Sequence, residues 1–160
     1  MKYVIGIDPG TSCGWAVLDE AGDRVGSGTW GLAKALSDGP GMRYIRFERL
    51  LRELVATFPD CVVSYEMVQP YGSGQAQAVY YKIVGRMESC LDELGIPYAG
   101  VRPAQYKKLA SGKGNADKQA VMAAAYRRWD LAADQTRAHP VPNDETDALW
   151  IAEAMRQGLA

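Results

Sequence analysis

A short apolar stretch that ends in an acid constrains the fold of this chain more than any other feature. Three of the residues before Asp8 are β-branched, and the turn signal Pro9-Gly10 follows directly after it. The pattern predicts a buried strand over residues 4–8 with a carboxylate at its carboxyl end. Asp8 either bonds the backbone amides of the following turn or holds a metal ion or a catalytic water at the rim of a sheet. The stretch alone gives these two interpretations equal weight.

The order of the predicted elements is that of an α/β protein. Residues 13–18 and 24–30 are predicted strands joined by the hairpin loop 19–23, so the first three strands form an antiparallel meander. Apolar residues at three- and four-residue spacing then predict helices that alternate with two further strands. The helices are expected over 42–58, 75–94, 103–109, 117–129 and 144–155, and the strands over 61–66 and 96–101. We expect a single domain over 1–160 with a five-stranded mixed sheet flanked by helices, as in the ribonuclease H-like fold, although this order does not exclude other α/β layers.

The composition is that of a globular chain. Of its 160 residues 48% are hydrophobic and 23% are charged, which allows a core without disulfides. No stretch approaches the roughly 20 apolar residues of a membrane helix, and the first apolar run stops too early for a signal peptide, so we expect a soluble, cytoplasmic protein. Cys13, Cys61 and Cys90 are isolated, which argues against a disulfide framework or a zinc site, and the last two are expected in the core.

Basic residues are concentrated in one segment, although the formal net charge is only −1. Residues 102–128 hold seven basic residues against the single acid Asp117, so this segment carries +6 and the remainder −7. Such a segment is compatible with a phosphate-binding face, but charge alone favours a lysine-rich solvated surface. The basic residues are Arg102, Lys107, Lys108, Lys113, Lys118, Arg127 and Arg128.

Acids recur at the ends of predicted elements. Glu66 closes the strand predicted over 61–66, and Asp144 and Asp147 lie one turn apart at the start of the last helix. If the first and fourth strands are parallel neighbours, Asp8 and Glu66 emerge at the same edge of the sheet. Four carboxylates at one rim would repel one another unless a cation were present, and their hard oxygens suit Mg²⁺ or Mn²⁺. Two such ions would suit phosphodiester hydrolysis.

Each acid also has a structural interpretation. Glu66 could be an exposed residue at a strand end. Asp144 could be a helix N-cap with Asp147 as its partner at the third helical position, and the helix dipole would favour both. Capping and metal binding can coexist, and acids at two strand ends together with an acid pair on the final helix favour a common site.

The residues at these positions resemble the RuvC-type Holliday-junction resolvases of the ribonuclease H-like superfamily. The segment Ile5-Gly6-Ile7-Asp8-Pro9-Gly10-Thr11 is similar to that family's opening strand, and Glu66 stands where its second acid stands. The segment Asp144-Glu145-Thr146-Asp147-Ala148-Leu149-Trp150-Ile151-Ala152 is similar to its closing helix. Lys107-Lys108-Leu109, followed by Gly112-Lys113-Gly114-Asn115-Ala116-Asp117-Lys118, is similar to its lysine-bearing stretch.

The resemblance implies a metal-dependent endonuclease that nicks opposing strands of a four-way junction symmetrically and leaves 5′-phosphate and 3′-hydroxyl ends. It implies Mg²⁺, with Mn²⁺ able to substitute, at two ions per site held by Asp8, Glu66, Asp144 and Asp147. Lys107 and Lys118 would stabilise the scissile phosphate, and Lys108 and Lys113 would contact DNA. The resemblance also implies a homodimer formed through the helix 75–94, for which ordinary packing against the sheet is the alternative.

The sequence departs from the family where an aromatic side chain is expected three residues after the second acid. Gln69 stands there, and Tyr71 follows two residues later. Tyr71 could supply a stacking platform for a base near the crossover, with Gln69 beside it, or be an ordinary exposed loop tyrosine. The change favours a broader preference for branched DNA. The single histidine, His139, is expected to be a surface residue rather than a base.

Two other function classes remain compatible with the sequence. A junction-binding module could keep the fold without the chemistry, although all four acids are present. The turn Asp8-Pro9-Gly10-Thr11 is also similar to a phosphate-binding turn of actin-like ATPases and sugar kinases. Those proteins need two such domains and a second phosphate motif, for which 160 residues leave little room.

Overall fold

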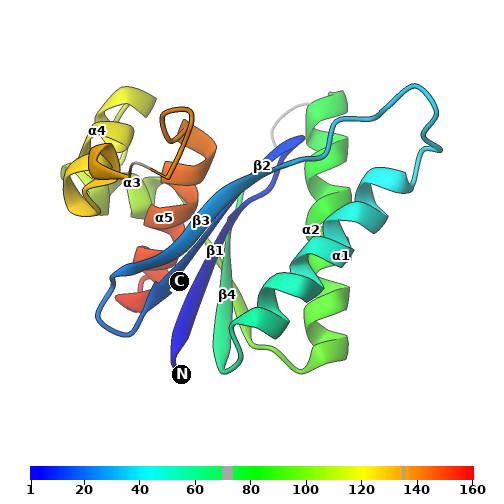
Figure 1. Ribbon diagram of the computed structural model, residues 1–160, viewed down its shortest axis with the longest axis horizontal. Helices are drawn as coiled ribbons and strands as arrows, with labels where there is room; N and C mark the ends of the chain where they lie inside the picture. The colour runs from blue at the N-terminus through cyan, green and yellow to red at the C-terminus, as the bar shows by residue number, and fades with distance from the viewer. Residues whose placement is uncertain (70–73, 135) are drawn as a thin grey trace.

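A mixed sheet of five strands organises the structure, which is a computed structural model that describes residues 1–69, 74–134 and 136–160. The strand order is β3-β2-β1-β4-β5. The first three strands pair antiparallel, and β4 is parallel to both β1 and β5 (Figure 1). The strands are β1 (Tyr3–Asp8), β2 (Ser12–Asp19), β3 (Arg24–Gly31), β4 (Cys61–Glu66) and β5 (Tyr98–Val101). The predicted antiparallel meander and five-stranded mixed sheet are confirmed.

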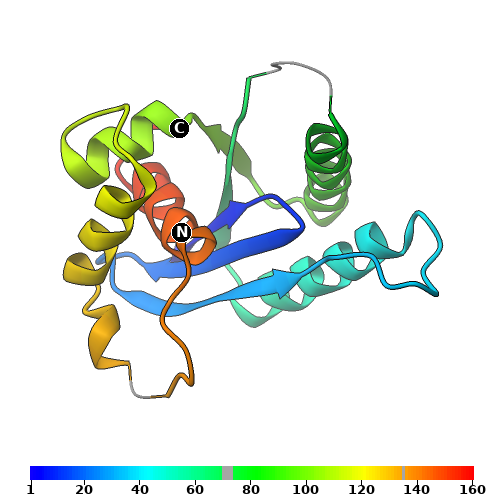
Figure 2. The same ribbon diagram turned by 90° about the horizontal axis from the view of Figure 1, so that it is seen from above.

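Helices cover both faces of the sheet. On one face lie α1 (Met42–Thr57) and α2 (Gln75–Leu94), and on the other lie α3 (Pro103–Ser111), α4 (Lys118–Arg128) and α5 (Asn143–Arg156) (Figures 1 and 2). A short 3₁₀ helix, η1 (Leu131–Ala133), follows α4.

The alternation of side chains along β1 builds a separate apolar core on each face of the sheet. Ile5 and Ile7 are fully buried and pack on the side of α1 and α2 with residues such as Phe47 and Met87. Val4 packs on the opposite side, in the cluster that contains the buried residues of α4 and α5. By the same alternation the side chain of Asp8, four residues after Val4, lies on the face covered by α5.

The backbone of α5 lies directly against the sheet at two glycines. A Cβ added to Gly6 would stand 2.0 Å from the carbonyl oxygen of Ala148, and one added to Gly14 would stand 1.9 Å from that of Asp144. Ser64 of β4 donates its hydroxyl to the carbonyl of Ile151 at 3.3 Å, which adds a third close contact. At positions 6 and 14 only a residue without a side chain allows this approach, so the two glycines fix the position of α5 over β1 and β2.

Most predicted boundaries agree with the structure to within one or two residues. β5 begins at Tyr98 rather than at residue 96: Pro97 accepts a bond from the Val63 amide but has no N–H to donate. The 3₁₀ helix η1 was not predicted from the sequence. Cys61 and Cys90 are buried free thiols, as expected. In the part of the chain that the structure describes, no helix has the length and apolarity needed to cross a membrane.

Replacing Gly6 with alanine should destabilise the protein by at least about 2 kcal/mol, because the new methyl group would overlap the α5 backbone, which cannot move without opening the core. Chemical denaturation followed by circular dichroism measures the loss. Gly85→Ala is the matched control. Gly85 lies within α2, and its added Cβ would meet no atom of the described residues within 4 Å. Helix propensity should then raise stability by about 0.5–1 kcal/mol. Equal effects of the two substitutions would contradict the proposed contact.

Candidate active site

The first two acids meet at the carboxyl edge of the two central strands. Asp8 is the last residue of β1 and Glu66 is the last residue of β4. The strands are parallel neighbours, with Ile7 opposite Tyr65, so both strands end at the same edge of the sheet. The first and fourth strands are thus parallel neighbours, and Asp8 and Glu66 emerge at the same edge of the sheet.

The second pair of acids comes from the start of α5. Asp144 lies in the first helical turn and Asp147 one turn further on. The interpretation of Asp144 as the helix N-cap is wrong, because Pro142 occupies that position and the helix begins at Asn143. Asp144 instead accepts a hydrogen bond at 3.1 Å from the side-chain amide of Asn143. Since Gly14 is the register partner of Asp8, the contact of Gly14 with the Asp144 backbone brings this pair to the end of β1.

All four carboxylates line one cleft of about 190 Å³. Lys107 from α3 and Lys118 from the start of α4 line it as well, so the two lysines expected at the site also reach it. The remaining lining residues are Tyr106, Val121 and Asn143. Lys108 and Lys113 are exposed and lie outside this cleft, and their contact with DNA stays a prediction.

Burial and mutual repulsion make it unfavourable for these carboxyl groups to be ionised together. The pKa of Asp8 lies well above its ordinary value, because of burial first and then the charges of Glu66, Asp147 and Asp144. Burial and Glu66 also raise the pKa of Asp147 to about 7, against the opposing effect of Lys107. The cleft therefore has an unbalanced negative potential that a bound cation would relieve.

Two tyrosines hold Glu66 from opposite sides of the sheet. Tyr80 of α2 donates its hydroxyl to the Glu66 carbonyl at 2.8 Å and accepts a bond at 3.0 Å from the amide of Val68. Tyr106 of α3 donates its hydroxyl to Oε1 of Glu66 at 2.8 Å. Burial and then the neighbouring Glu66 and Asp147 raise the pKa of Tyr106. Tyr106 was not identified from the sequence, because a tyrosine on a helix face with apolar neighbours is typical of a core residue.

Glu145 was not identified from the sequence either; it lies between the two acids of α5 and is fully buried. It accepts hydrogen bonds from Ser27 of β3 at 2.6 Å and from Arg137 at 2.8 Å. Arg24 continues this network, because it donates to Ser27 at 3.1 Å and forms an ion pair with Asp134 at 2.7 Å. The network ties the start of α5 and the loop before it to the edge of the sheet. A buried charge without such partners would be strongly destabilising.

The remaining candidates do not line the cleft. Gln69 is exposed. Tyr71 lies outside the residues that the structure describes. His139 is exposed and contributes to two other surface hollows, which it shares with Arg137 and Pro140, so the interpretation as a surface residue is favoured.

The donor set of the cleft fits a hard divalent cation. In the ranges that the structure describes, no three His, Cys, Asp or Glu side chains are gathered tightly enough to hold an ion in their present positions. The case for a cation site therefore depends on the type of donor atoms and on their charge. Four partly buried carboxyl groups face one small cleft, and burial together with mutual repulsion raises the pKa of two of them, Asp8 and Asp147. Oxygen donors of this kind suit Mg²⁺ or Mn²⁺, and a cation would draw them together.

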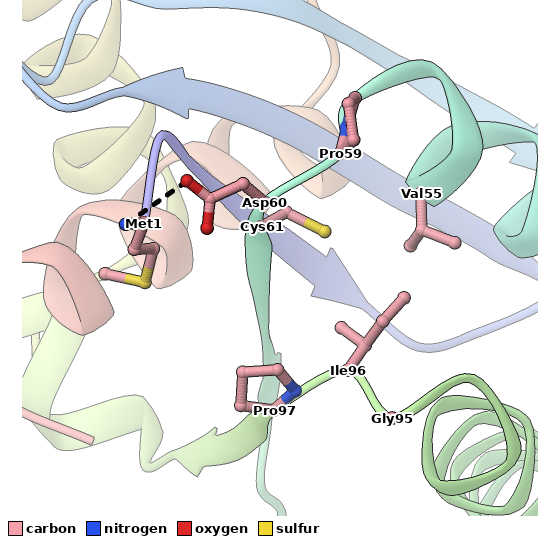
Figure 3. Close-up of a pocket in the computed structure, with 8 residues that line it drawn as sticks. All are labelled: Met1, Val55, Pro59, Asp60, Cys61, Gly95, Ile96 and Pro97. Carbon is pink, nitrogen blue, oxygen red and sulfur yellow. Dashed lines mark ion pairs between the residues drawn. The ribbon is translucent and has the colours of Figure 1, made fainter.

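A larger hollow of about 430 Å³ lies at the opposite end of the sheet, where β1 and β4 begin (Figure 3). Its single acid, Asp60, is paired with the amino group of Met1 at 3.3 Å. The other lining residues are Val55, Pro59, Cys61, Gly95, Ile96 and Pro97. A mostly apolar hollow with one paired acid lacks the groups that phosphodiester chemistry requires, so the acidic cleft is the candidate active site.

Comparison with known proteins identifies similar sequences and similar folds. A family model described as crossover junction endodeoxyribonuclease RuvC matches residues 4–154. Proteins with that name from Synechococcus sp. (strain WH7803) and Streptomyces griseus subsp. griseus are 30% and 32% identical to the chain. Both matches cover 93% of it, and they cover 94% and 72% of those proteins.

Two solved structures share the fold. Thermus thermophilus RuvC in complex with a Holliday junction substrate is similar with a TM-score of 0.80 and 24% identity, over 100% of this chain and 98% of that one. The fowlpox virus resolvase, solved with Holliday junction DNA, is similar with a TM-score of 0.61 and 13% identity, over 98% and 99%.

Without divalent ions, the folded protein should lose stability as pH rises from about 4 to above 7. The raised pKa values of Asp8 and Asp147 mean that the folded state binds more protons than the unfolded state in this window, so each deprotonation costs folding free energy. Urea unfolding in EDTA across this range measures the slope, and Mg²⁺ should restore stability above pH 7. Asp147→Asn should flatten the slope. A stability that rises with pH in EDTA would contradict the electrostatic account.

Proposed function

The chain belongs to the RuvC family of crossover junction endodeoxyribonucleases, and we propose that it cuts Holliday junctions or other branched DNA by metal-dependent phosphodiester hydrolysis. The observation that carries the proposal is the cleft in which four carboxylates from β1, β4 and α5 meet two lysines. Because the chain belongs to this family, the Asp8–Thr11 turn is assigned to the nuclease fold and not to an actin-like ATPase.

The acids are proposed as the metal ligands. Asp8, Glu66, Asp144 and Asp147 would hold two Mg²⁺ ions, with Mn²⁺ able to substitute. Bound ions of this kind supply activation of the attacking water and Lewis-acid stabilisation of the charge that develops on the phosphate and the leaving 3′ oxygen. The contribution of the chain itself is to hold carboxylates from three separate elements at one edge of the sheet.

The lysines are proposed to bind the phosphate. Lys107 and Lys118 enter the cleft from two different helices, so both can approach a phosphate group that lies beside the acids. Their charges would offset that of the phosphodiester as it approaches the acidic cleft. Hydrolysis with the 3′ oxygen as leaving group would give 5′-phosphate and 3′-hydroxyl ends. The exposed Lys108 and Lys113 would contact the flanking backbone.

Residues just beyond β4 are proposed to contact the bases. Gln69 is exposed three residues after Glu66, close along the chain to the cleft. Tyr71, outside the described residues, would supply the stacking surface. A polar residue at position 69 favours activity on several kinds of branched DNA.

We also propose that the protein acts as a homodimer through α2. One side of this helix packs on the sheet through Ile83 and Met87, which are fully buried. On another side of the helix Tyr81 is 42% exposed. This large, mostly apolar side chain could contact a second copy of the chain. Two copies would present two clefts, as symmetric nicking of opposing strands requires.

Replacing Asp8 with asparagine should slow cleavage of a labelled four-way junction at least about a hundredfold, because a metal ligand worth several kcal/mol of transition-state stabilisation is lost. Wild-type cleavage should require Mg²⁺ and stop in EDTA, while Asp8→Asn should still bind the junction. Asp60→Asn makes the same change in an exposed acid at the far end of the sheet and should leave cleavage unchanged. Binding without metal-dependent cleavage by the wild type would identify a junction-binding module instead.

Replacing Tyr81 with glutamate should convert a dimer into a monomer. Sedimentation equilibrium should give twice the chain mass of 17.5 kDa for the wild type and the single mass for the variant, with little change in melting temperature. Leu36→Glu, which changes another exposed apolar residue on the loop before α1, should leave the dimer intact. A monomeric wild type, or a dimeric Tyr81→Glu variant, would contradict an interface through this face of α2.

A further inference from the structure

Tyr106 combines a packed ring with a hydroxyl group in the active-site cleft. The side chain is 1% exposed, and its ring belongs to the apolar cluster on the face of α4 and α5. Its hydroxyl lies 2.8 Å from Oε1 of Glu66, and the residue lines the cleft with the four acids. The packing fixes the ring, so the direction of the hydroxyl toward Glu66 is fixed as well.

The bond from Tyr106 completes the anchoring of Glu66. Tyr80 holds the main-chain carbonyl of Glu66 from the other face of the sheet, so it fixes the backbone but leaves the carboxylate free to rotate. The hydrogen bond from Tyr106 restricts that rotation. A tyrosine hydroxyl is a donor at neutral pH, and a carboxylate bonded through Oε1 keeps Oε2 available for another partner.

We propose that Tyr106 is a positioning residue of the nuclease site, which orients the Glu66 carboxylate so that its second oxygen faces the divalent ions. This inference rests on the proposed function. Tyr106 also precedes Lys107 in the same turn of α3, so the one hydrogen bond joins the helix that carries this lysine to the end of β4. The spacing between the acid and the phosphate-binding lysine is thereby set by a direct contact.

A packing role alone would depend on the ring and not on the hydroxyl group. Tyr106→Phe keeps the ring and removes the donor, so the two roles give different results. If Tyr106 positions the carboxylate, the variant should bind Mn²⁺ about tenfold more weakly in calorimetric titration without DNA, as expected when a partner of a metal ligand is lost. The Mg²⁺ concentration for half-maximal cleavage should rise by a similar factor, with a smaller change in the rate at saturating Mg²⁺.

Tyr65→Phe is the matched control. Tyr65 lies next to Glu66 on β4 and donates its hydroxyl to Oε1 of Glu88 at 2.7 Å, on the face of the sheet away from the cleft. The control removes a tyrosine–glutamate bond of nearly the same length from the same strand. It should leave the affinity for Mn²⁺ and the Mg²⁺ dependence of cleavage at their wild-type values.

Wild-type Mn²⁺ affinity in Tyr106→Phe would overturn the inference and leave the proposed function intact. A wild type that neither binds Mn²⁺ nor cuts a junction would overturn both. A crystal structure of the wild type with Mn²⁺ tests the same contact without a variant, so a poorly folded Tyr106→Phe would not prevent the test. The inference requires Tyr106 to remain bonded to Glu66 in that structure, and a carboxylate turned away from Tyr106 would refute it.

Discussion

The close contact between the α5 backbone and the sheet is the constraint on which the site depends. Helices usually pack on sheets through side chains, which hold the two backbones apart. Here Gly6 and Gly14 remove that layer, and the carbonyls of Ala148 and Asp144 lie where their side chains would be. Acids near the C-terminus of the chain therefore reach an acid near its N-terminus. Larger residues at these two positions would separate the acids of α5 from the ends of β1 and β4.

Holding four carboxylates together costs stability, and the surrounding structure compensates for part of this cost. Lys107 and Lys118 lower the pKa of Asp147, although burial and Glu66 outweigh them. The network of Glu145, Ser27 and Arg137 fixes the first turn of α5 from the side away from the cleft. This arrangement places a neutralised ion pair next to an unneutralised group of acids. Such a contrast is typical of a site where the ligand supplies the missing charge.

The sequence predicted the strands, the α-helices and the four acids because these depend on local patterns. Alternating and apolar runs define the strands, and Asp8 and Glu66 stand at the ends of those runs. Tyr106 and Glu145 could not be predicted, because their roles depend on contacts with residues 40 and 118 positions away. Glu145 lies between two acids in a helix and has the pattern of a solvated residue, yet it is fully buried. The capping interpretation of Asp144 failed because the helix begins at Asn143 and Pro142 is its N-cap. The single domain over 1–160 and the role of Tyr71 stay predictions.

The side chains that line the cleft leave an excess of negative charge that a divalent cation would offset. Four ionised carboxylates exceed the two lysines by two negative charges, and a phosphodiester adds a third. Divalent cations would offset this excess and allow the phosphodiester to approach the acids. Without ions, the cleft can reduce its excess only by retaining protons, and the pKa of Asp147 at about 7 is consistent with that. Metal binding and proton release at this site should therefore be coupled, because the same carboxyl oxygens bind either a proton or a cation.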